Sequence, residues 1–332
     1  MLKTPGKSRR EFLGLCVSGA AALSAGALGE GEPVAAEGKS TVAIAHDENL
    51  RGADGRLDEQ RMLALVDRVV QALYRTNSAM EAWRALVKPG QTVGLKVNTL
   101  GGRGIATSPV LAAAICERLQ QAGVRAGDIA VWDRDSTEME RAGYRIETAG
   151  NRVQCYGTDR VDYEEELSAW GSVGSRLSKL LTRRSDVLIN LPVLKDHDGA
   201  GVTLAMKNMY GVIHNPNKYH PNGCDPYVAD LNMLPEIRSR MRLAICDATT
   251  AMYEGGPAYK PEFAWHCNRL LAARDVVALD ATGWRTIERK RAEKGLKSLE
   301  ADERAPKYIW TAADAEHRLG HADAARIAVV EA

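Results

Sequence analysis

The chain has 332 residues, of which 45% are hydrophobic and 26% charged, and its formal net charge is +1. This composition is typical of a globular protein with a sizeable core, and it excludes a disordered or collagen-like chain. The nearly cancelling charges and the low aromatic content of 5% give no indication of a nucleic-acid partner.

The first 36 residues have the pattern of an export signal. Residues 8–14 read SRREFLG, a twin-arginine motif, and an apolar stretch dominated by Ala and Gly follows. Val34, Ala35 and Ala36 supply small residues for signal peptidase, so we predict cleavage after Ala36. The alternative, a retained anchor, needs a longer and more apolar stretch. We therefore expect passage through the twin-arginine translocation machinery, a periplasmic or otherwise exported location, and no stable membrane insertion after cleavage.

Five cysteines follow the predicted leader, an odd number without a C-x-x-C pair: Cys116, Cys155, Cys224, Cys246 and Cys267. An exported protein held by a disulfide framework usually has an even and denser set. The spacing also makes an iron–sulfur cluster improbable. The twin-arginine pathway carries folded proteins, which permits a cofactor to be loaded before export but does not identify one.

Apolar runs and helical spacings alternate through the first half of the remaining chain. In order, they predict a strand at 41–46, a helix at 58–74, a strand at 92–98, a helix at 109–121, a strand at 128–133, a helix at 137–142 and a strand at 153–156. Asp58 and Ser108 are the expected N-caps, and Pro109 occupies the first helical position.

The second half continues the alternation and contains one exception. It predicts a helix at 175–181, strands at 186–191 and 241–247, a helix at 275–291 and a strand at 327–330. The exception is the polar segment 200–235, which is rich in Asn, Pro, Tyr and His and too long for an ordinary connection, so we interpret it as a lid or insertion. The predicted fold is a single α/β domain over 41–331, three-layered, with a mostly parallel Rossmann-like sheet and helices on both faces.

Polar residues end four of the predicted strands. Ligands of such sheets bind beyond the carboxyl ends of the strands, so these ends are the expected site. The strand ends carry Lys96 and Asn98, then Asp133, then Asn190 followed by Lys195 and His197, and finally Asp247. Ordinary capping of strand ends is the alternative interpretation.

Several ordered motifs resemble those of the domain of unknown function 362 (DUF362) family. They are GLKVN at 94–98, TSP at 107–109, INLPVLK at 189–195 with His197, TLAMKN at 203–208 with Gly211, Asp230, Asp247 before GGP at 255–257, and ARDVVALD at 273–280. The resemblance spans about residues 41–290. It implies no particular activity. Many similar proteins also carry a ferredoxin-like cysteine cluster, which is not found in this sequence.

Three lysines occur in apolar or motif-rich surroundings, where a solvated lysine is not expected: Lys96, Lys195 and Lys207. A buried lysine needs an anion or a lowered pKa. We predict a substrate site formed by Lys96, Asn98, Asn190, Lys195, Thr203, Lys207 and Asn208, with Thr203 and Lys207 one turn apart on a helix. Backbone N–H groups at the start of that helix are a further candidate for binding an anion. Structural pairing of the lysines with Asp133, Asp196 or Asp247 is the other interpretation.

Histidines in the same region suggest a metal or an acid–base role. His197, His214 and His220 have neighbouring carboxylates and form the candidate ligand set for a divalent metal, although no tight metal motif is present. His197 and Asp247 are the candidate catalytic residues for proton transfer. Two functions remain open: an enzyme that acts on a small anionic substrate, with or without the help of a metal, and a non-catalytic periplasmic protein that binds a ligand or handles a cofactor.

Overall fold

The structure is a computed structural model that describes residues 38–332. The predicted twin-arginine motif and the cleavage site after Ala36 lie outside the described residues. In the part described, no helix is both long enough and apolar enough to cross a bilayer.

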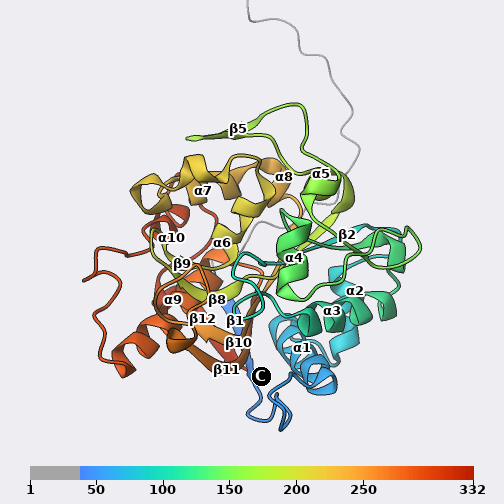
Figure 1. Ribbon diagram of the computed structural model, residues 1–332, viewed down its shortest axis with the longest axis horizontal. Coiled ribbons are helices and arrows are strands. Elements are labelled where there is room, and N and C mark those ends of the chain that lie inside the picture. Colours follow the sequence, from blue (N-terminus) through green and yellow to red (C-terminus); the bar gives the residue numbers. More distant parts are fainter. Residues whose placement is uncertain (1–37) are drawn as a thin grey trace, which may run out of the picture. The chain divides into compact units, whose positions relative to one another are not determined.

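A ten-stranded sheet forms the centre of the fold, and most of its strand pairs are parallel (Figure 1). Its main path runs in the order β12-β1-β11-β10-β7-β2-β3-β4. The bounds along this path are β12 (Ile327–Glu331), β1 (Ser40–His46), β11 (Ala264–Ala273), β10 (Met241–Met252), β7 (Val187–Asn190), β2 (Val93–Lys96), β3 (Ile129–Trp132) and β4 (Gln154–Cys155). Only β11 runs antiparallel to its neighbours on this path, β1 and β10.

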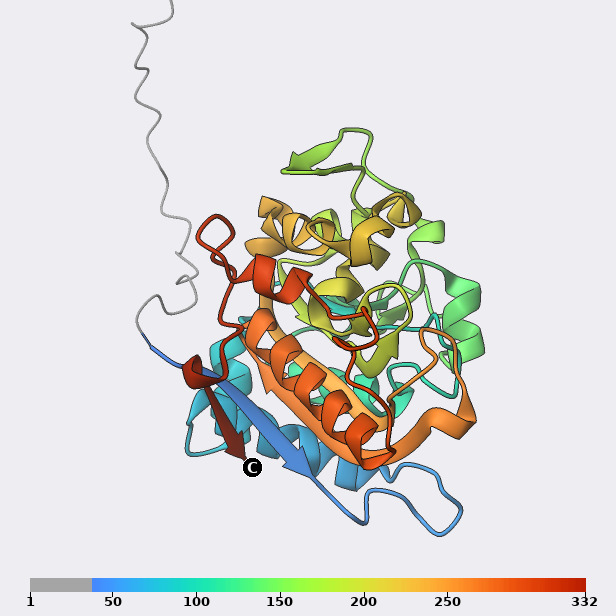
Figure 2. The ribbon, with the colours of Figure 1, turned by 90° about the vertical axis from the view of Figure 1, so that its left-hand side faces the viewer.

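Helices cover both faces of the sheet, which confirms the predicted three layers. Along β1, Val42 and Ile44 belong to one core cluster and Ala43 and Ala45 to the other, because successive side chains point to opposite faces. The cluster of Ala43 is closed by α1 (Glu59–Tyr74), α2 (Ala79–Leu86), α3 (Pro109–Gln121) and α4 (Ser136–Ala142). The other is closed by α5 (Lys179–Arg184), α6 (Ala205–Asn208), α7 (Tyr227–Met233), α8 (Pro235–Arg238), α9 (Val276–Glu293) and α10 (Tyr308–Ala312), and Figure 2 shows α9 packed on the sheet and running alongside its strands.

Helix starts follow the local capping signals. The Asp58 side chain accepts a hydrogen bond from the backbone N–H of Arg61 at the start of α1, and Ser108 accepts one from Val110 at the start of α3. Pro109 occupies the first turn of α3, where its missing N–H leaves no bond unmade. Both predicted N-caps are confirmed.

The predicted helix at 175–181 is misplaced. Residues up to Ser175 belong to the short hairpin of β5 (Ser168–Trp170) and β6 (Val173–Ser175), and α5 begins only at Lys179, where Ser178 is the N-cap. The strands β5 and β6 were not predicted, nor were three strands of the large sheet: β8 (Val193–His197), β9 (Gly201–Thr203) and β11. Their sequences place Lys, Asp, His, Asn or Gly among the apolar residues, and tertiary pairing overrides this weak local signal.

The polar segment 200–235 is folded against the protein. It comprises β9, α6, α7 and short 3-10 turns, and it buries Leu204, Met209, Val212 and Leu231 in the core on the α9 side of the sheet. Its other side faces the carboxyl ends of β2, β3 and β7. The segment therefore forms one wall of the space above these strand ends.

Candidate functional site

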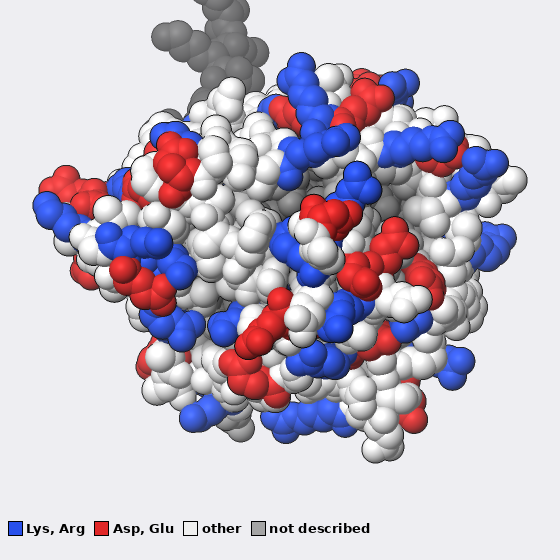
Figure 3. All heavy atoms as spheres, turned by 60° about the horizontal axis from the view of Figure 1, so that its bottom comes forward, with Lys and Arg blue, Asp and Glu red and all other residues white. Residues whose placement is uncertain are grey.

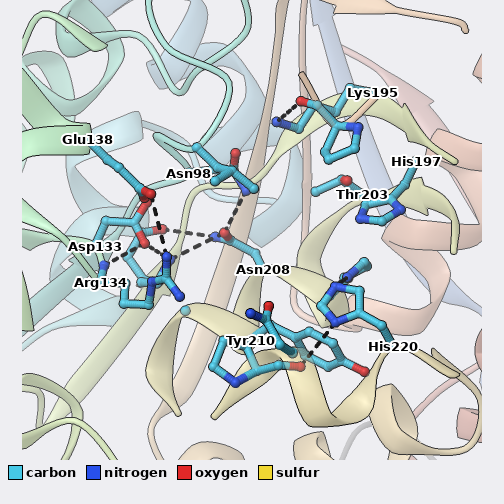
Figure 4. Close-up of a pocket in the computed structure, with 17 residues that line it drawn as sticks. Asn98, Asp133, Arg134, Glu138, Lys195, His197, Thr203, Asn208, Tyr210 and His220 are labelled. Atoms are coloured by element: carbon cyan, nitrogen blue, oxygen red, sulfur yellow. Dashed lines mark hydrogen bonds and ion pairs between the residues drawn. The ribbon is translucent and has the colours of Figure 1, made fainter. Parts of the chain in front are cut away.

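A cavity of about 160 Å³ lies at the carboxyl ends of β2 and β3 (Figure 4). One wall carries Lys96 at the end of β2, Asn98 beyond it, and Asp133 directly after β3. The opposite wall comes from the branch of the sheet formed by β8 and β9, from α6, and from the turns that follow it. About half of the lining residues belong to the segment 200–235.

The first wall contains a closed ion pair. Lys96 is buried, and its Nζ lies 2.7 Å from Oδ1 of Asp133 and 2.6 Å from the carbonyl oxygen of Val97, to which it donates. The other carboxylate oxygen of Asp133 accepts hydrogen bonds of 2.8 Å from both the backbone N–H and the hydroxyl of Thr99. Burial raises the pKa of the Asp133 carboxyl, but Lys96 and these donors outweigh burial, so its pKa lies below the ordinary value.

The Lys96–Asp133 pair depends on a glycine in the opposite wall. A Cβ atom at Gly211 would lie 2.7 Å from Nζ of Lys96 and 2.9 Å from Oδ1 of Asp133. Any larger residue would therefore push into the ion pair, which explains why a glycine follows Tyr210 here.

Lys195 on the second wall has no such partner. It is fully buried, and the single hydrogen bond of its Nζ is donated to the carbonyl oxygen of Pro257, at 3.1 Å. The adjacent carboxylate of Asp196 points to the other side of β8, where it accepts hydrogen bonds from Arg304 and from the backbone N–H of Gly256. Burial lowers the pKa of Lys195 to about 8; Asp133 and Asp196 raise it and Lys207 lowers it further.

Lys207 is the second buried lysine of this wall. Its Nζ lies over the ring of Tyr210, 4.2 Å from the ring centroid, and 3.4 Å from Nε2 of His220. Among residues 38–332, no carboxylate is within ion-pair distance of Nζ of Lys195 or of Lys207. Burial lowers the pKa of Lys207, although the Cys224 thiol and Asp198 raise it.

His197 lies beside the two lysines as a neutral imidazole. Burial lowers its pKa to about 2, and the charges of Lys207, His220 and Lys195 act in the same direction. Its Nδ1 lies 3.1 Å from the backbone nitrogen of Gly199 and 3.1 Å from Oδ1 of the exposed Asp198. The ring is stacked on that of His220 at a centroid distance of 6.0 Å. A pKa this low opposes protonation of the ring at neutral pH, so a proton can pass through it only if one ring nitrogen gains a proton as the other loses one.

Two buried oxygen atoms of the cavity lack a hydrogen-bond partner among the described residues, Oγ1 of Thr203 and Oδ1 of Asn98. Thr203 pairs directly with Lys195 in the antiparallel ladder of β8 and β9, so both side chains lie on the same face. An unpaired buried polar atom typically costs about 1–3 kcal/mol, and a bound ligand removes this cost when it supplies the missing bond.

The structure places most of the predicted binding residues around this cavity. The predicted residues that line it are Lys96, Asn98, Lys195, His197, Thr203, Lys207, Asn208 and His220. Thr203 and Lys207 do not share a helix, however, because Thr203 ends β9 and α6 begins at Ala205. The backbone N–H groups of Ala205 and Met206 donate to the buried carboxyl group of Asp280, so these donors at the start of α6 already have an acceptor within the protein.

Two of the predicted catalytic and substrate-binding residues do not line the cavity. Asp247, predicted to move protons, accepts hydrogen bonds from the backbone N–H of Ser108 and from Thr249, so its carboxylate holds the start of α3 instead. Asn190 donates to the carbonyl oxygen of Ala205 and accepts from Asn208, so it connects the end of β7 to α6. Both side chains are satisfied by the protein itself.

The predicted set of three histidines is not assembled. His214 is exposed and interacts with Ser175 and with the backbone N–H of Arg176, while His197 and His220 stack in the cavity. Within residues 38–332, no group of three or more His, Cys, Asp or Glu side chains is arranged to hold a metal ion. The sequence spacing brought His214 into the set, but the chain turns away from the cavity there.

Several residues of the cavity were not predicted as part of the site, among them Arg134, Glu138, Tyr210 and Pro257. Arg134 follows Asp133 just beyond the end of β3 and lies 3.5 Å from Glu138 at this side of the cavity (Figure 4). Its position next to Asp133 at a strand end is the sequence signal by which Arg134 could have been found. Tyr210 and Pro257 offered no comparable signal, because they contribute a ring face and a carbonyl oxygen.

Comparisons with known proteins show similarity to a family and to two individual proteins. Residues 93–285 match the family model described as domain of unknown function (DUF362). A thylakoid-associated protein of Synechocystis sp. is 30% identical over 214 residues, which are 58% of this chain and 62% of that protein. A crystal structure of a protein from Thermotoga maritima matches with a TM-score of 0.40 and 10% identity, and the match covers 72% of this chain and 60% of that one. This chain thus spans less than two thirds of either relative.

Proposed function

This chain belongs to the DUF362 family, a family defined without an activity, and we propose from its own cavity that it binds and processes a small anionic substrate. The observation that carries the proposal is the pair of buried ammonium groups, Lys195 and Lys207, which have no carboxylate partner among residues 38–332. Burying a charge without a partner is costly, so such a pair is favourable where a ligand supplies the opposite charge.

The polar groups around the lysines fit an anion that also accepts hydrogen bonds. The hydroxyl of Thr203 is unpaired and lies across the strand pair from Lys195. Arg134 adds a further cation to the cavity lining, although it shares its charge with Glu138. The neutral ring of His197 supplies a group for proton transfer next to the bound ligand. These groups together support an enzymatic role in which His197 moves a proton.

The positive charge of the proposed site is internal. On the face shown in Figure 3, Lys and Arg side chains are interspersed with Asp and Glu, and no region of a single sign covers that face. A small ligand that enters the cavity is therefore recognised by a few buried groups, where the low local dielectric strengthens each interaction.

Removing the charge of Lys207 tests this proposal. The probes are oxalate, pyruvate and inorganic phosphate, each added to the purified protein in a thermal unfolding experiment. We expect at least one of them to raise the Tm of the wild type by about 5 °C or more at saturating concentration. The Lys207→Met variant should fold and lose this shift, because the buried charge contributes about 2–5 kcal/mol to binding.

Lys218→Met is the matched control for Lys207→Met. Lys218 also lies over a tyrosine ring, that of Tyr219 at 5.4 Å, but it is exposed and does not line the cavity. This variant should keep the full thermal shift. If no probe stabilises the wild type, or if Lys207→Met keeps the shift, the proposed function is wrong.

We further propose that the protein is exported through the twin-arginine pathway. The support is the SRREFLG motif at 8–14 and the small-residue stretch after it. Replacing Arg9 and Arg10 with lysine should leave the full-length precursor in the cytoplasm, as detected by cell fractionation and immunoblotting. Normal export of that variant would contradict the proposal.

A further inference from the structure

We propose that Lys195 is a nucleophilic amine that forms an imine with the carbonyl group of a small oxo acid bound in the cavity. The inference rests on the proposed function and names the class of substrate, a carboxylate with an adjacent aldehyde or ketone. It assigns separate tasks to the two lysines without carboxylate partners: Lys207 binds the carboxylate, and Lys195 attacks the carbonyl carbon.

The surroundings of Lys195 suit an attacking amine. Its Nζ donates to the carbonyl oxygen of Pro257, a neutral acceptor, and no carboxylate holds it as an ammonium ion. The backbone of Gly101 also lies close to this amine, since a Cβ atom added to Gly101 would be 3.2 Å from Nζ of Lys195. Lys96, at the other wall, is the opposite case: Asp133 lies 2.7 Å from its Nζ and forms an ion pair with it.

A neighbouring cation and burial together favour the neutral form of Lys195, as in other lysines that form imines. Burial is the largest influence and Lys207 adds to it, which lowers the pKa of Lys195 to about 8. Lys207 remains available for a carboxylate, because its neighbours are the Tyr210 ring, His220 and the Cys224 thiol, and no carboxylate among residues 38–332 is within ion-pair distance. A cavity of about 160 Å³ that contains both lysines requires a short ligand, in which the carbonyl and the carboxylate are close together.

The remaining groups supply the proton transfers of imine formation. The amine nitrogen of Lys195 forms a bond to the carbonyl carbon, which gives a carbinolamine. The two amine protons and the carbonyl oxygen then leave as water while the C=N double bond forms. The hydroxyl of Thr203 is placed to donate a hydrogen bond to that oxygen, and the neutral imidazole of His197 to relay the proton. No oxidant or reductant is consumed.

Reductive trapping in the wild-type protein tests this inference. The protein is incubated at pH 7 with glyoxylate or pyruvate and sodium cyanoborohydride, digested, and the modified lysine is located by mass spectrometry. We expect the secondary amine at Lys195, with labelling about tenfold or more above that of the exposed Lys88. Oxalate, which has the charge but no ketone or aldehyde, should compete with the labelling.

Variants separate the role of Lys195 from general reactivity. Lys195→Arg keeps the charge and cannot form the adduct, so labelling at this position should disappear, while Lys88→Arg should leave the labelling of Lys195 unchanged. Because the adduct is mapped in the wild type, the result does not depend on whether a variant folds.

The outcomes distinguish the inference from the proposed function. If oxalate raises the Tm but neither oxo acid labels Lys195, the imine is wrong and the anion site stands. If no anion raises the Tm and Lys195 is not labelled, both are wrong. Labelling spread evenly over the surface lysines also overturns the inference.

Discussion

The two walls of the cavity bury lysines in opposite ways. On the wall of β2 and β3, Lys96 has a carboxylate at 2.7 Å, a backbone carbonyl at 2.6 Å and a glycine opposite that leaves room for the pair. On the wall of β8 and α6, Lys195 has one carbonyl contact, and Lys207 has a ring face and a histidine. Lys96 is therefore paired within the fold, whereas Lys195 and Lys207 have no carboxylate partner among residues 38–332.

Burial and sequence context do not distinguish these lysines. All three are buried, and all three occur in the motifs that resemble the DUF362 family. The opposite charge distinguishes them, because a buried ion pair is complete within the protein while a buried unpaired ammonium is not. Substitutions on the two walls should therefore have opposite effects on stability.

The largest effect is expected from Lys96→Met. The variant leaves the Asp133 carboxylate buried without its cation, so the free energy of unfolding should fall by about 3–5 kcal/mol, measured by urea denaturation. The double variant Lys96→Met/Asp133→Asn removes both charges and should recover much of this loss. If the Lys96→Met variant is as stable as the wild type, the proposed difference between the two walls is wrong.

A pH-dependent effect of intermediate size is expected at Lys195. Its pKa is about 8 in the folded protein and near the ordinary value of 10.5 in the unfolded chain, so the unfolded state binds more protons between these values. Stability attributable to Lys195 therefore increases as the pH rises from about 8 to 10.5. Below pH 8 the burial of the ammonium is fully unfavourable.

Lys195→Met removes this titration and makes it measurable. At pH 7 the variant should be more stable than the wild type, and this advantage should shrink by on the order of 2–3 kcal/mol as the pH rises to 10. Urea denaturation of both proteins at pH 7, 8, 9 and 10 gives the difference, since the other titrating groups cancel. A pH-independent difference would contradict the unpaired state of Lys195.

The smallest effect is expected from Thr203→Val. The Thr203 hydroxyl is buried without a partner, so an isosteric methyl group should stabilise the ligand-free protein by about 1 kcal/mol in urea denaturation. Thr107→Val is the matched control: the Thr107 hydroxyl donates to the carbonyl oxygen of Leu191 and accepts from the N–H of Asn98, so its loss should cost about 1–3 kcal/mol. Equal effects of the two substitutions would show that the Thr203 hydroxyl has a hydrogen-bond partner in the folded protein.

Much of the fold was predictable because its signals are local. The start of α3 follows from Ser108 and Pro109, and the short apolar runs that became β2, β3 and β7 lie within a few residues of their predicted bounds. The strand β11 was missed because its first half is only partly buried and mixes His, Asn and Arg with apolar residues. Its pairing with β1 and β10 comes from the sheet.

The sequence predicted the types of residue that form the candidate site better than it predicted which individual residues line it. Polar residues at strand ends pointed to Lys96, Asn98 and Lys195, which line the cavity because parallel strands bring these ends to one edge of the sheet. The same rule included Asp247, which the structure places against the start of α3. A strand-end position therefore identifies candidates, and the direction of each side chain decides among them.

The sequence by itself determined the helices α1, α3, α4 and α9, most strands, the mostly parallel three-layer architecture, and a set of lysine, asparagine and histidine candidates. Those properties depend on periodicity and capping, which act over a few residues. Only the tertiary structure decided that Lys96 pairs with Asp133, that Asp196 turns toward Arg304, and that Lys195 and Lys207 remain without a carboxylate. Charge pairing between residues far apart in the chain depends on where the folded backbone directs each side chain, and no local pattern encodes that direction.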